Sequence, residues 1–238
     1  MTTRALSIAP YAADALAGRE RPGIGLGHGY ILVGDQVLAL TPPGQPRMPN
    51  GIETDLVVAE GEAVTAGGGS LRTATATVEG GPLWNPRPSP RVTLSLRPQP
   101  QLRLDRLAGR GPGLTPLGDD IVIGYLAAAA LNGTPRADVH ALVTHTARRT
   151  TRLSATLLYL AAGGALPEAA HPLLLDGDPE PLLRFGATSG RGIAFGLALC
   201  GIRNGAASSN ETGVTIGGFE LVIGTRTAPS KPLEVAHV

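Results

Sequence analysis

Lysine is almost absent from this sequence: of 20 basic residues, only Lys231 is a lysine. Schiff-base catalysis and a phosphate-binding P-loop both depend on a lysine amine, so neither is expected. Any bound anion would have to be held by arginine side chains or by backbone amides.

Aromatic residues are also scarce, at 3% of the chain, and the formal net charge is only +1. Proteins that bind single-stranded nucleic acid need aromatic side chains for base stacking, and those that bind duplexes need a concentrated positive field. Nucleic acid is therefore excluded as a partner, and small molecules or other proteins remain.

The single cysteine, Cys200, cannot form an internal disulfide, and it lies in the apolar run 197–202. It is expected to act as a small core side chain in a reducing compartment. The sequence shows no leader-like segment and no run of eighteen apolar residues, so no membrane association is expected. These features favour a cytoplasmic protein.

The pattern along the chain predicts an α+β fold with a β-rich N-terminal half, a small sheet or barrel-like lobe. Residues 30–33 and 37–40 read as a hairpin across a three-residue turn, and further strands are expected at 55–58, 71–78 and 92–96. The proline-dense stretch 82–90 is expected to cover a sheet edge or to lead into the next lobe.

From about residue 102 the sequence becomes rich in Ala and Leu, as in packed helices. Helices are expected at 116–131, 135–162 with a break near Thr150, 167–176, 179–185 and 189–203. The resulting division is a β-rich lobe at 1–100, a helical lobe at 101–205, and a segment 206–238 with one strand at 213–224 and a frayed tail, all within one compact unit.

The most informative segment is 109–120, where alternating glycines precede an apolar helix. Thr115 is placed as the N-cap and Pro116 as the first helical residue. Backbone amides of Gly111 and Gly113 could form an anion-binding nest at the helix start, with Arg110 adding a bidentate contact. The alternative is that the glycines only turn the chain.

Asp119 and Asp120 open this helix, where they either complement the helix dipole or take part in chemistry. Two carboxylates could hold a divalent cation such as Mg²⁺ or orient an amine, although no cofactor is required. Because adjacent helical residues point about 100° apart, one of the two is expected to be chemical and the other structural.

A second segment, 186–196, has a similar pattern: a glycine turn, hydroxyl residues at the cap and a helix that begins with small residues. Thr188 or Ser189 is expected as the N-cap, with Gly190 in the first turn. Gly192 and Gly196, four apart, would alternatively provide a smooth face for close helix packing. In 150–156, Arg152 and its neighbouring hydroxyls either face the same pocket or lie on the solvated surface.

Other candidate sites are weak. The alternating glycines of 23–29 do not fit a dinucleotide fingerprint, since a hairpin rather than a helix follows. His140 and His145 are five residues apart, which is not the spacing of a helical metal pair, so no metal site is expected there. Cys200 lacks an evident base and is not expected to be a nucleophile.

The segments 111–120 and 186–190 resemble the paired signatures of a bacterial family that includes the AllH-type subunit of oxamate carbamoyltransferase, over roughly residues 20–205. The resemblance implies a multi-subunit enzyme of allantoin degradation that converts oxalurate and phosphate to oxamate and carbamoyl phosphate. It implies a site made by the following residues: Gly111, Gly113, Thr115, Asp119, Asp120, Thr188, Ser189 and Gly190. Gly192 stands where the family pattern has an acidic residue.

The leading hypothesis is therefore carbamoyl or amide group transfer, with a small anion held by amides at two converging helix starts. Asp119, Asp120 and Thr115 would be the catalytic candidates, and Arg110 and Arg152 would assist binding. The alternatives are a non-catalytic scaffold or regulatory subunit that binds a small anion, and an enzyme acting on another carbamoyl or amide compound.

Overall fold

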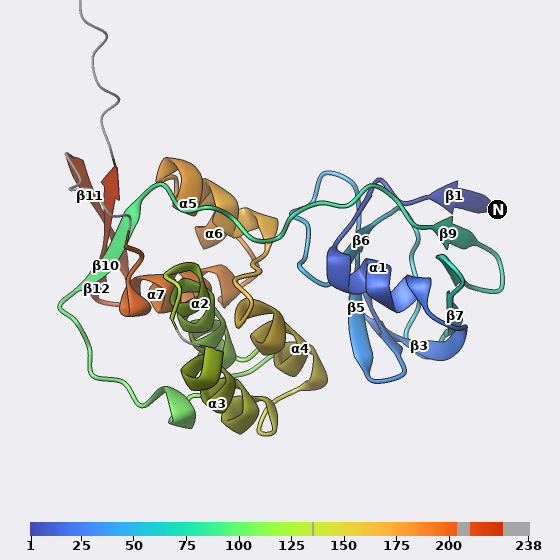
Figure 1. The fold of residues 1–238 in the computed structure, drawn as a ribbon, viewed down its shortest axis with the longest axis horizontal. Coiled ribbons are helices and arrows are strands. Elements are labelled where there is room, and N and C mark those ends of the chain that lie inside the picture. Colours follow the sequence, from blue (N-terminus) through green and yellow to red (C-terminus); the bar gives the residue numbers. More distant parts are fainter. Residues whose placement is uncertain (135, 204–209, 226–238) are drawn as a thin grey trace, which may run out of the picture.

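The computed structural model describes residues 1–134, 136–203 and 210–225. Within these residues a β-rich lobe adjoins a helical lobe, and a small sheet lies on the far side of the helices (Figure 1). The predicted α+β class is confirmed, with most strands in the N-terminal half.

The β-rich lobe is one sheet that, in the described residues, has nine strands in the order β1-β9-β8-β7-β3-β4-β5-β6-β2. Its edge strands β1 and β2 are separated along the chain by only two residues, so the sheet has to curl until its edges meet. Helix α1 covers it (Figure 1). The elements are β1 (Thr2–Arg4), β2 (Ser7–Ile8), α1 (Pro10–Ala17), β3 (Arg21–Gly27), β4 (Tyr30–Val33), β5 (Gln36–Thr41), β6 (Gly51–Glu53), β7 (Ala63–Gly67), β8 (Ser70–Arg72) and β9 (Thr77–Glu79).

Strand β5 joins the cores of the two lobes. Leu38 and Leu40 pack into the core of the β-rich lobe, whereas Val37 and Ala39 pack with the buried residues of the helical lobe. Successive side chains of a strand point to opposite faces, so a strand buried on both faces reads as a continuous apolar run. The predicted hairpin of β4 and β5 is confirmed, but its turn has two residues, Gly34 and Asp35, rather than three, because Gln36 already pairs with Val33.

The helical lobe follows the expected helices closely, including the break near Thr150, although residue 135 lies outside the described residues. Thr151 begins the helix after the break, since its hydroxyl accepts a hydrogen bond from the Ser154 amide at 3.1 Å. The elements are η1 (Leu104–Arg106), α2 (Leu117–Leu131), α3 (Arg136–Ala147), α4 (Arg152–Ala161), η2 (Glu168–Ala170), α5 (His171–Asp176), α6 (Glu180–Leu183) and α7 (Ser189–Cys200).

Helices α2 and α7 pack against each other through glycine. A Cβ added at Gly196 would lie 2.0 Å from the Ile121 carbonyl oxygen, and one at Gly192 would lie 3.0 Å from a methyl group of Leu117. The packing role considered for these two glycines is thus confirmed. Because contacts advance along both helices in the same direction, α2 and α7 run parallel and begin side by side.

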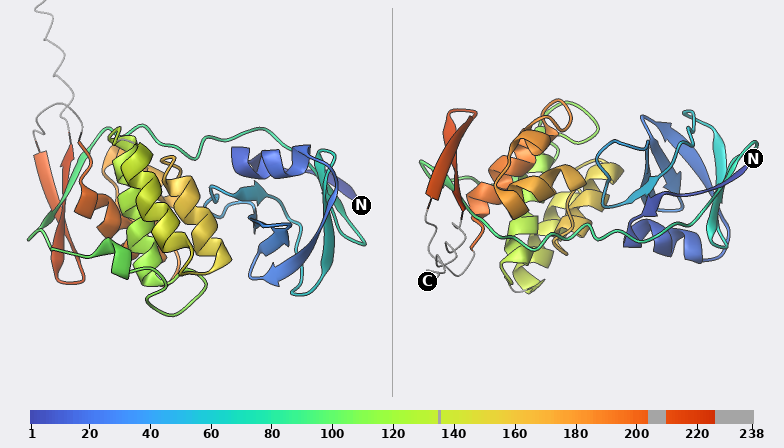
Figure 2. Two further views of the ribbon diagram at one scale, coloured as in Figure 1. Left: turned by 60° about the horizontal axis from the view of Figure 1, so that its bottom comes forward. Right: turned by 90° about the horizontal axis from the view of Figure 1, so that it is seen from above.

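The proline-dense segment 82–90 runs between the lobes and along the helices toward β10 (Thr93–Arg97) (Figures 1 and 2). It also covers a sheet edge, since Leu83 forms a parallel bridge with Ile8 of β2. Strand β10 does not join the large sheet. It pairs with β12 (Phe219–Thr225), which in turn pairs with β11 (Asn210–Ile216).

Three strand predictions were wrong. The single strand expected at 71–78 is two antiparallel strands, β8 and β9, because the Thr73 hydroxyl accepts the Ala76 amide at 3.1 Å and the chain turns there. Residues 55–58 form no strand, because the Thr54 hydroxyl accepts the Leu56 amide locally at 3.1 Å and Val57 is exposed. The single strand expected at 213–224 is a hairpin, in which β11 and β12 turn at Gly217 and Gly218, both with positive φ.

The predicted division at residues 100 and 205 stays a prediction, and the predicted tail at 226–238 lies outside the described residues. No helix in the described ranges has the length and apolar character needed to cross a membrane.

Candidate functional site

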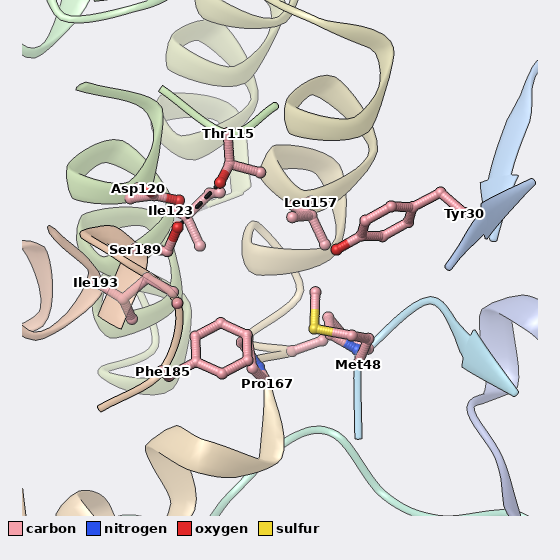
Figure 3. Close-up of a pocket in the computed structure, with 13 residues that line it drawn as sticks. Tyr30, Met48, Thr115, Asp120, Ile123, Leu157, Pro167, Phe185, Ser189 and Ile193 are labelled. Atoms are coloured by element: carbon pink, nitrogen blue, oxygen red, sulfur yellow. Dashed lines mark hydrogen bonds between the residues drawn. The ribbon is translucent and has the colours of Figure 1, made fainter. Parts of the chain in front are cut away.

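The starts of α2 and α7 meet at one point, as the sequence predicted. The hydroxyls of Thr115 and Ser189 lie 3.0 Å apart and form a hydrogen bond between the two segments (Figure 3). Parallel helices that begin together direct two N-terminal turns, each carrying roughly half a positive charge, toward the same region. Several of their amides are already bound to backbone carbonyls, since Gly118 donates to Arg110, Asp119 to Pro116 and Gly190 to Phe185.

The caps differ in detail from the prediction. Helix α2 begins at Leu117 with Pro116 as its N-cap, so Thr115 stands one residue before the cap. Its hydroxyl is turned toward Ser189 rather than toward its own helix. Thr188 is the N-cap of α7, as one of the two predicted candidates, but its side chain makes no capping hydrogen bond.

A cavity of about 260 Å³ opens at this point, between the two lobes. Its polar corner is made by Thr115, Asp120 and Ser189, and most of the remaining lining is apolar (Figure 3). The polar hollow expected from the sequence is therefore polar on one side only. The other lining residues are Tyr30, Met48, Pro49, Ile123, Leu157, Ala165, Pro167, Phe185, Gly186 and Ile193.

Asp120 is the ionisable group on the helical side of this cavity. It is 1% exposed, and its Oδ2 makes no hydrogen bond to any residue that the structure describes. Burial raises the pKa of Asp120 to about 7, and the neighbouring charge of Asp119 adds to the shift, while the Ser189 and Thr115 hydroxyls oppose it. A carboxyl group with this pKa can both give and take a proton near neutral pH.

Asp119 is fully buried and faces away from the cavity. Its carboxylate accepts the Gly109 amide at 2.8 Å and the Thr150 hydroxyl in a short hydrogen bond. These contacts fasten the glycine turn and the break between α3 and α4 to the first turn of α2. Asp119 thus has structural contacts of the kind predicted for one of the two carboxylates, and a chemical role for Asp120 stays a prediction.

Tyr30 reaches the cavity from β4, and its hydroxyl points toward the interior (Figure 3). Burial raises the pKa of Tyr30, and the charge of Asp120 raises it further. The charge of Asp120 therefore reaches Tyr30 across the cavity, although the two residues belong to different lobes. Neither spacing nor motif in the sequence indicated Tyr30.

The remaining predicted site residues do not line this cavity. Arg110, Gly111 and Gly113 are exposed, and both glycines have positive φ, as the turn requires. Thr188 is exposed too. Gly190 is buried. It packs so closely on the backbone before α7 that an added Cβ would lie 1.6 Å from the Leu182 carbonyl oxygen.

Arg152 lines a different hollow, of about 340 Å³, together with Tyr11 and Asp35. Among the residues that the structure describes, no basic side chain belongs to the lining of the Asp120 cavity. Two basic side chains that the sequence did not single out, His28 and Arg184, line an adjoining hollow of about 460 Å³. That hollow shares four residues with the cavity: Tyr30, Met48, Phe185 and Gly186.

The weak candidates keep structural roles. The imidazoles of His140 and His145 contact Thr144 and Arg149 of their own segment, and burial raises the pKa of the Cys200 thiol. Across the described residues, no group of three or more His, Cys, Asp or Glu side chains is arranged to hold a metal ion.

Comparison with known proteins gives a family match for the helical lobe and none for the β-rich lobe. No match was found among curated proteins or among solved structures. The resemblance seen in the sequence is confirmed over a shorter range than expected, which contains the glycine turn, Asp119, Asp120 and all of α7 but excludes the β-rich lobe. Residues 107–201 match the family model of the oxamate carbamoyltransferase subunit AllH.

Proposed function

We propose that this chain is a subunit or relative of a carbamoyl-transfer enzyme and that it binds a small carbamoyl or amide compound in the Asp120 cavity. The observation that carries the proposal is the buried, unpartnered Asp120 Oδ2 beside two parallel helix starts. The match of residues 107–201 to the AllH family supports the reaction class.

Charge in the cavity would be balanced without a basic side chain. The two helix starts contribute positive potential, and protonated Asp120 can donate a hydrogen bond to an anionic oxygen. Ionised Asp120 would instead repel an anion and accept an N–H from an amide. Arg110 and Arg152, proposed from the sequence as anion ligands, would have to act from outside the cavity.

In transfer of a carbamoyl group from oxalurate to phosphate, the leaving amide nitrogen needs a proton. Asp120, with a pKa of about 7, could supply it as a general acid. The Thr115 and Ser189 hydroxyls could stabilise negative charge that develops on the carbamoyl oxygen. Asp119 would position the first turn of α2 rather than act on the substrate.

Binding of oxamate, oxalurate, phosphate and carbamoyl phosphate by isothermal titration calorimetry tests this proposal. Affinity for oxamate should rise as the pH falls from 8 to 6, by about tenfold in total and mostly above pH 7, because anion binding takes up a proton at Asp120. Asp120→Asn should flatten this dependence. Arg97→Gln, on the three-stranded sheet, is the control and should leave it unchanged.

An assay with the partner subunits separates catalysis from binding. Asp120→Asn should lower turnover by about 10²- to 10⁴-fold if Asp120 is a general acid, with Mg²⁺ present or removed by chelation. Wild-type turnover in Asp120→Asn would exclude that role. Binding of these ligands without any effect on turnover would favour the alternative of a non-catalytic anion-binding subunit, which the largely apolar lining also fits.

A further inference from the structure

The loop before β6 is joined to the helical lobe beside the cavity. Arg47, in this loop, forms an ion pair with Glu168 of η2, its Nε donating to Oε2 at 3.0 Å and its Nη2 to Oε1 in a shorter contact. The backbone adds two hydrogen bonds: the Arg47 amide donates to Oε2 at 3.0 Å, and the Glu168 amide donates to the Arg47 carbonyl at 2.9 Å.

These contacts cross 121 positions in the sequence and connect the two lobes. The pair is partly buried, with exposed side-chain fractions of 30% and 36%. Bidentate arginine–carboxylate geometry is the arrangement in which an ion pair holds its partners in one orientation. By contrast, most single-contact surface pairs contribute little.

The neighbours of this pair in the sequence are cavity residues. Met48 and Pro49 follow Arg47 directly, and Pro167 precedes Glu168, and all three line the Asp120 cavity. Figure 3 shows Met48 and Pro167 on the side of the cavity opposite the helix starts. Each partner of the ion pair is thus a direct neighbour in sequence of a residue in this wall.

Trp84, from the segment that joins the lobes, completes the cluster. The Arg47 guanidinium carbon lies 4.8 Å from the centroid of the indole ring, and the His171 ring centroid lies 5.8 Å from it. An arginine stacked on an aromatic face and held by a carboxylate is restricted in two directions.

We infer that Arg47 and Glu168 are positioning residues, which hold the Met48, Pro49 and Pro167 wall against the helix starts and so set how tightly the cavity binds its ligand. They do not touch the cavity interior themselves. The part of this inference that concerns a ligand rests on the proposed function, whereas the part that concerns the wall does not.

The chain contains a single tryptophan, so emission from Trp84 reports on this cluster alone. Arg47→Met and Glu168→Ala should each shift the Trp84 emission spectrum and its quenching by acrylamide. They should also weaken oxamate or carbamoyl phosphate binding roughly threefold to tenfold, the range expected for charged hydrogen bonds that are partly exposed. Glu168→Gln, which keeps one acceptor, should fall between Glu168→Ala and the wild type.

The matched control for Glu168→Ala is Glu211→Ala, which removes the Arg97–Glu211 pair on the three-stranded sheet, far from the cavity in the fold (Figure 1). It should change neither Trp84 emission nor ligand affinity. The charge-exchanged double variant of Arg47→Glu with Glu168→Arg should recover part of the affinity lost by either single variant. If a single variant does not fold, as judged by circular dichroism, the conservative and double variants still carry the test.

Two failures can be told apart. If the wild type binds none of the four ligands, the proposed function fails, and the Trp84 spectra still decide whether the pair holds the wall. If the wild type binds oxamate and Glu168→Ala binds it equally well despite a shifted Trp84 spectrum, the positioning role is overturned. An unchanged Trp84 spectrum in both single variants would overturn the inference that the ion pair holds the wall in place.

Discussion

The cavity has two walls that hold their side chains in place in different ways. On the helical side, α2 and α7 touch through glycine, so the backbones themselves fix where Asp120, Thr115 and Ser189 stand. On the β side, Tyr30 comes from a strand, while Met48 lies in a loop that is joined to the helices by the Arg47–Glu168 ion pair and two hydrogen bonds of the Arg47 and Glu168 backbones. The helical wall is therefore set by direct packing of two helix backbones, whereas the opposite wall depends on a few contacts that a single side-chain substitution can weaken.

The largest expected effect concerns the helical wall, where the Asp120 carboxyl group should make the free energy of unfolding depend on pH. The folded-state pKa of Asp120, about 7, is above its ordinary value of 3.8, so the native protein binds more protons than the unfolded chain between those values. This carboxyl group should therefore reduce the free energy of unfolding as the pH rises from about 4 to 7, by up to about 4 kcal/mol.

Asp120→Asn removes this contribution, so at pH 8 the variant should be more stable than the wild type, and at pH 4 nearly equal to it. Chemical denaturation at several pH values measures the difference. Asp119→Asn is the comparison variant and should lose stability at every pH, by roughly 1–3 kcal/mol, because Asp119 accepts two hydrogen bonds. Equal pH slopes in the wild type and Asp120→Asn would contradict the ionisation assigned to Asp120.

A direct way to break the helical wall is Gly196→Ala. Its Cβ would lie 2.0 Å from the Ile121 carbonyl oxygen and 2.8 Å from the Tyr125 amide nitrogen, and neither backbone atom can move without separating the helices. We expect a loss of about 3 kcal/mol in the free energy of unfolding, at the upper end of the usual cost of overpacking.

Gly18→Ala is the matched control for this substitution. Gly18 lies in the β-rich lobe, does not have positive φ, and has no atom within 4 Å of an added Cβ. Its effect on thermal unfolding should stay within about 1 kcal/mol and could be stabilising. A similar melting temperature for both variants would mean that the glycine contact between α2 and α7 is not what fixes the helical wall.

The smallest expected effect concerns communication between the walls. Burial is the main cause of the raised pKa of Tyr30, and the Asp120 charge adds to it. In Asp120→Asn the pKa of Tyr30 should fall slightly and remain above the ordinary tyrosine value. Nuclear magnetic resonance titration of ring-labelled tyrosine measures this, with Tyr30→Phe to assign the signal among the four tyrosines. An unchanged Tyr30 titration would place the two groups out of electrostatic reach.

Much of the helical wall could be predicted from the sequence, because its signals are local. Glycine turns, a proline at the helix start, and Gly192 and Gly196 at a spacing of four residues indicated where α2 and α7 begin and how they pack. The predicted N-cap of α2 was wrong by one residue, because the Thr115 hydroxyl forms its hydrogen bond with the Ser189 hydroxyl and not with the backbone of α2.

The β wall could not be predicted in the same way. Tyr30 and Met48 stand in segments whose patterns indicate only a hairpin and a proline-rich loop, and their role depends on which lobe they face. Strand β10 was expected to continue the N-terminal strands, but it pairs with β12, a partner more than a hundred residues further along the chain. Non-local pairing of this kind leaves no mark in the local pattern.

From its amino-acid order alone, the chain shows a strand-rich first half, a helix-rich second half, scarce lysine and two glycine-led helix starts, because propensity, periodicity and turn chemistry act over a few residues. Only the packing of the two lobes decided which side chains line the cavity. Asp120 faces it and Asp119 does not, and Tyr30 reaches it from the other lobe. Arg110 and Arg152 lie outside it. Those outcomes depend on how each helix is rotated about its axis and which surfaces meet, and contacts distant in sequence set both.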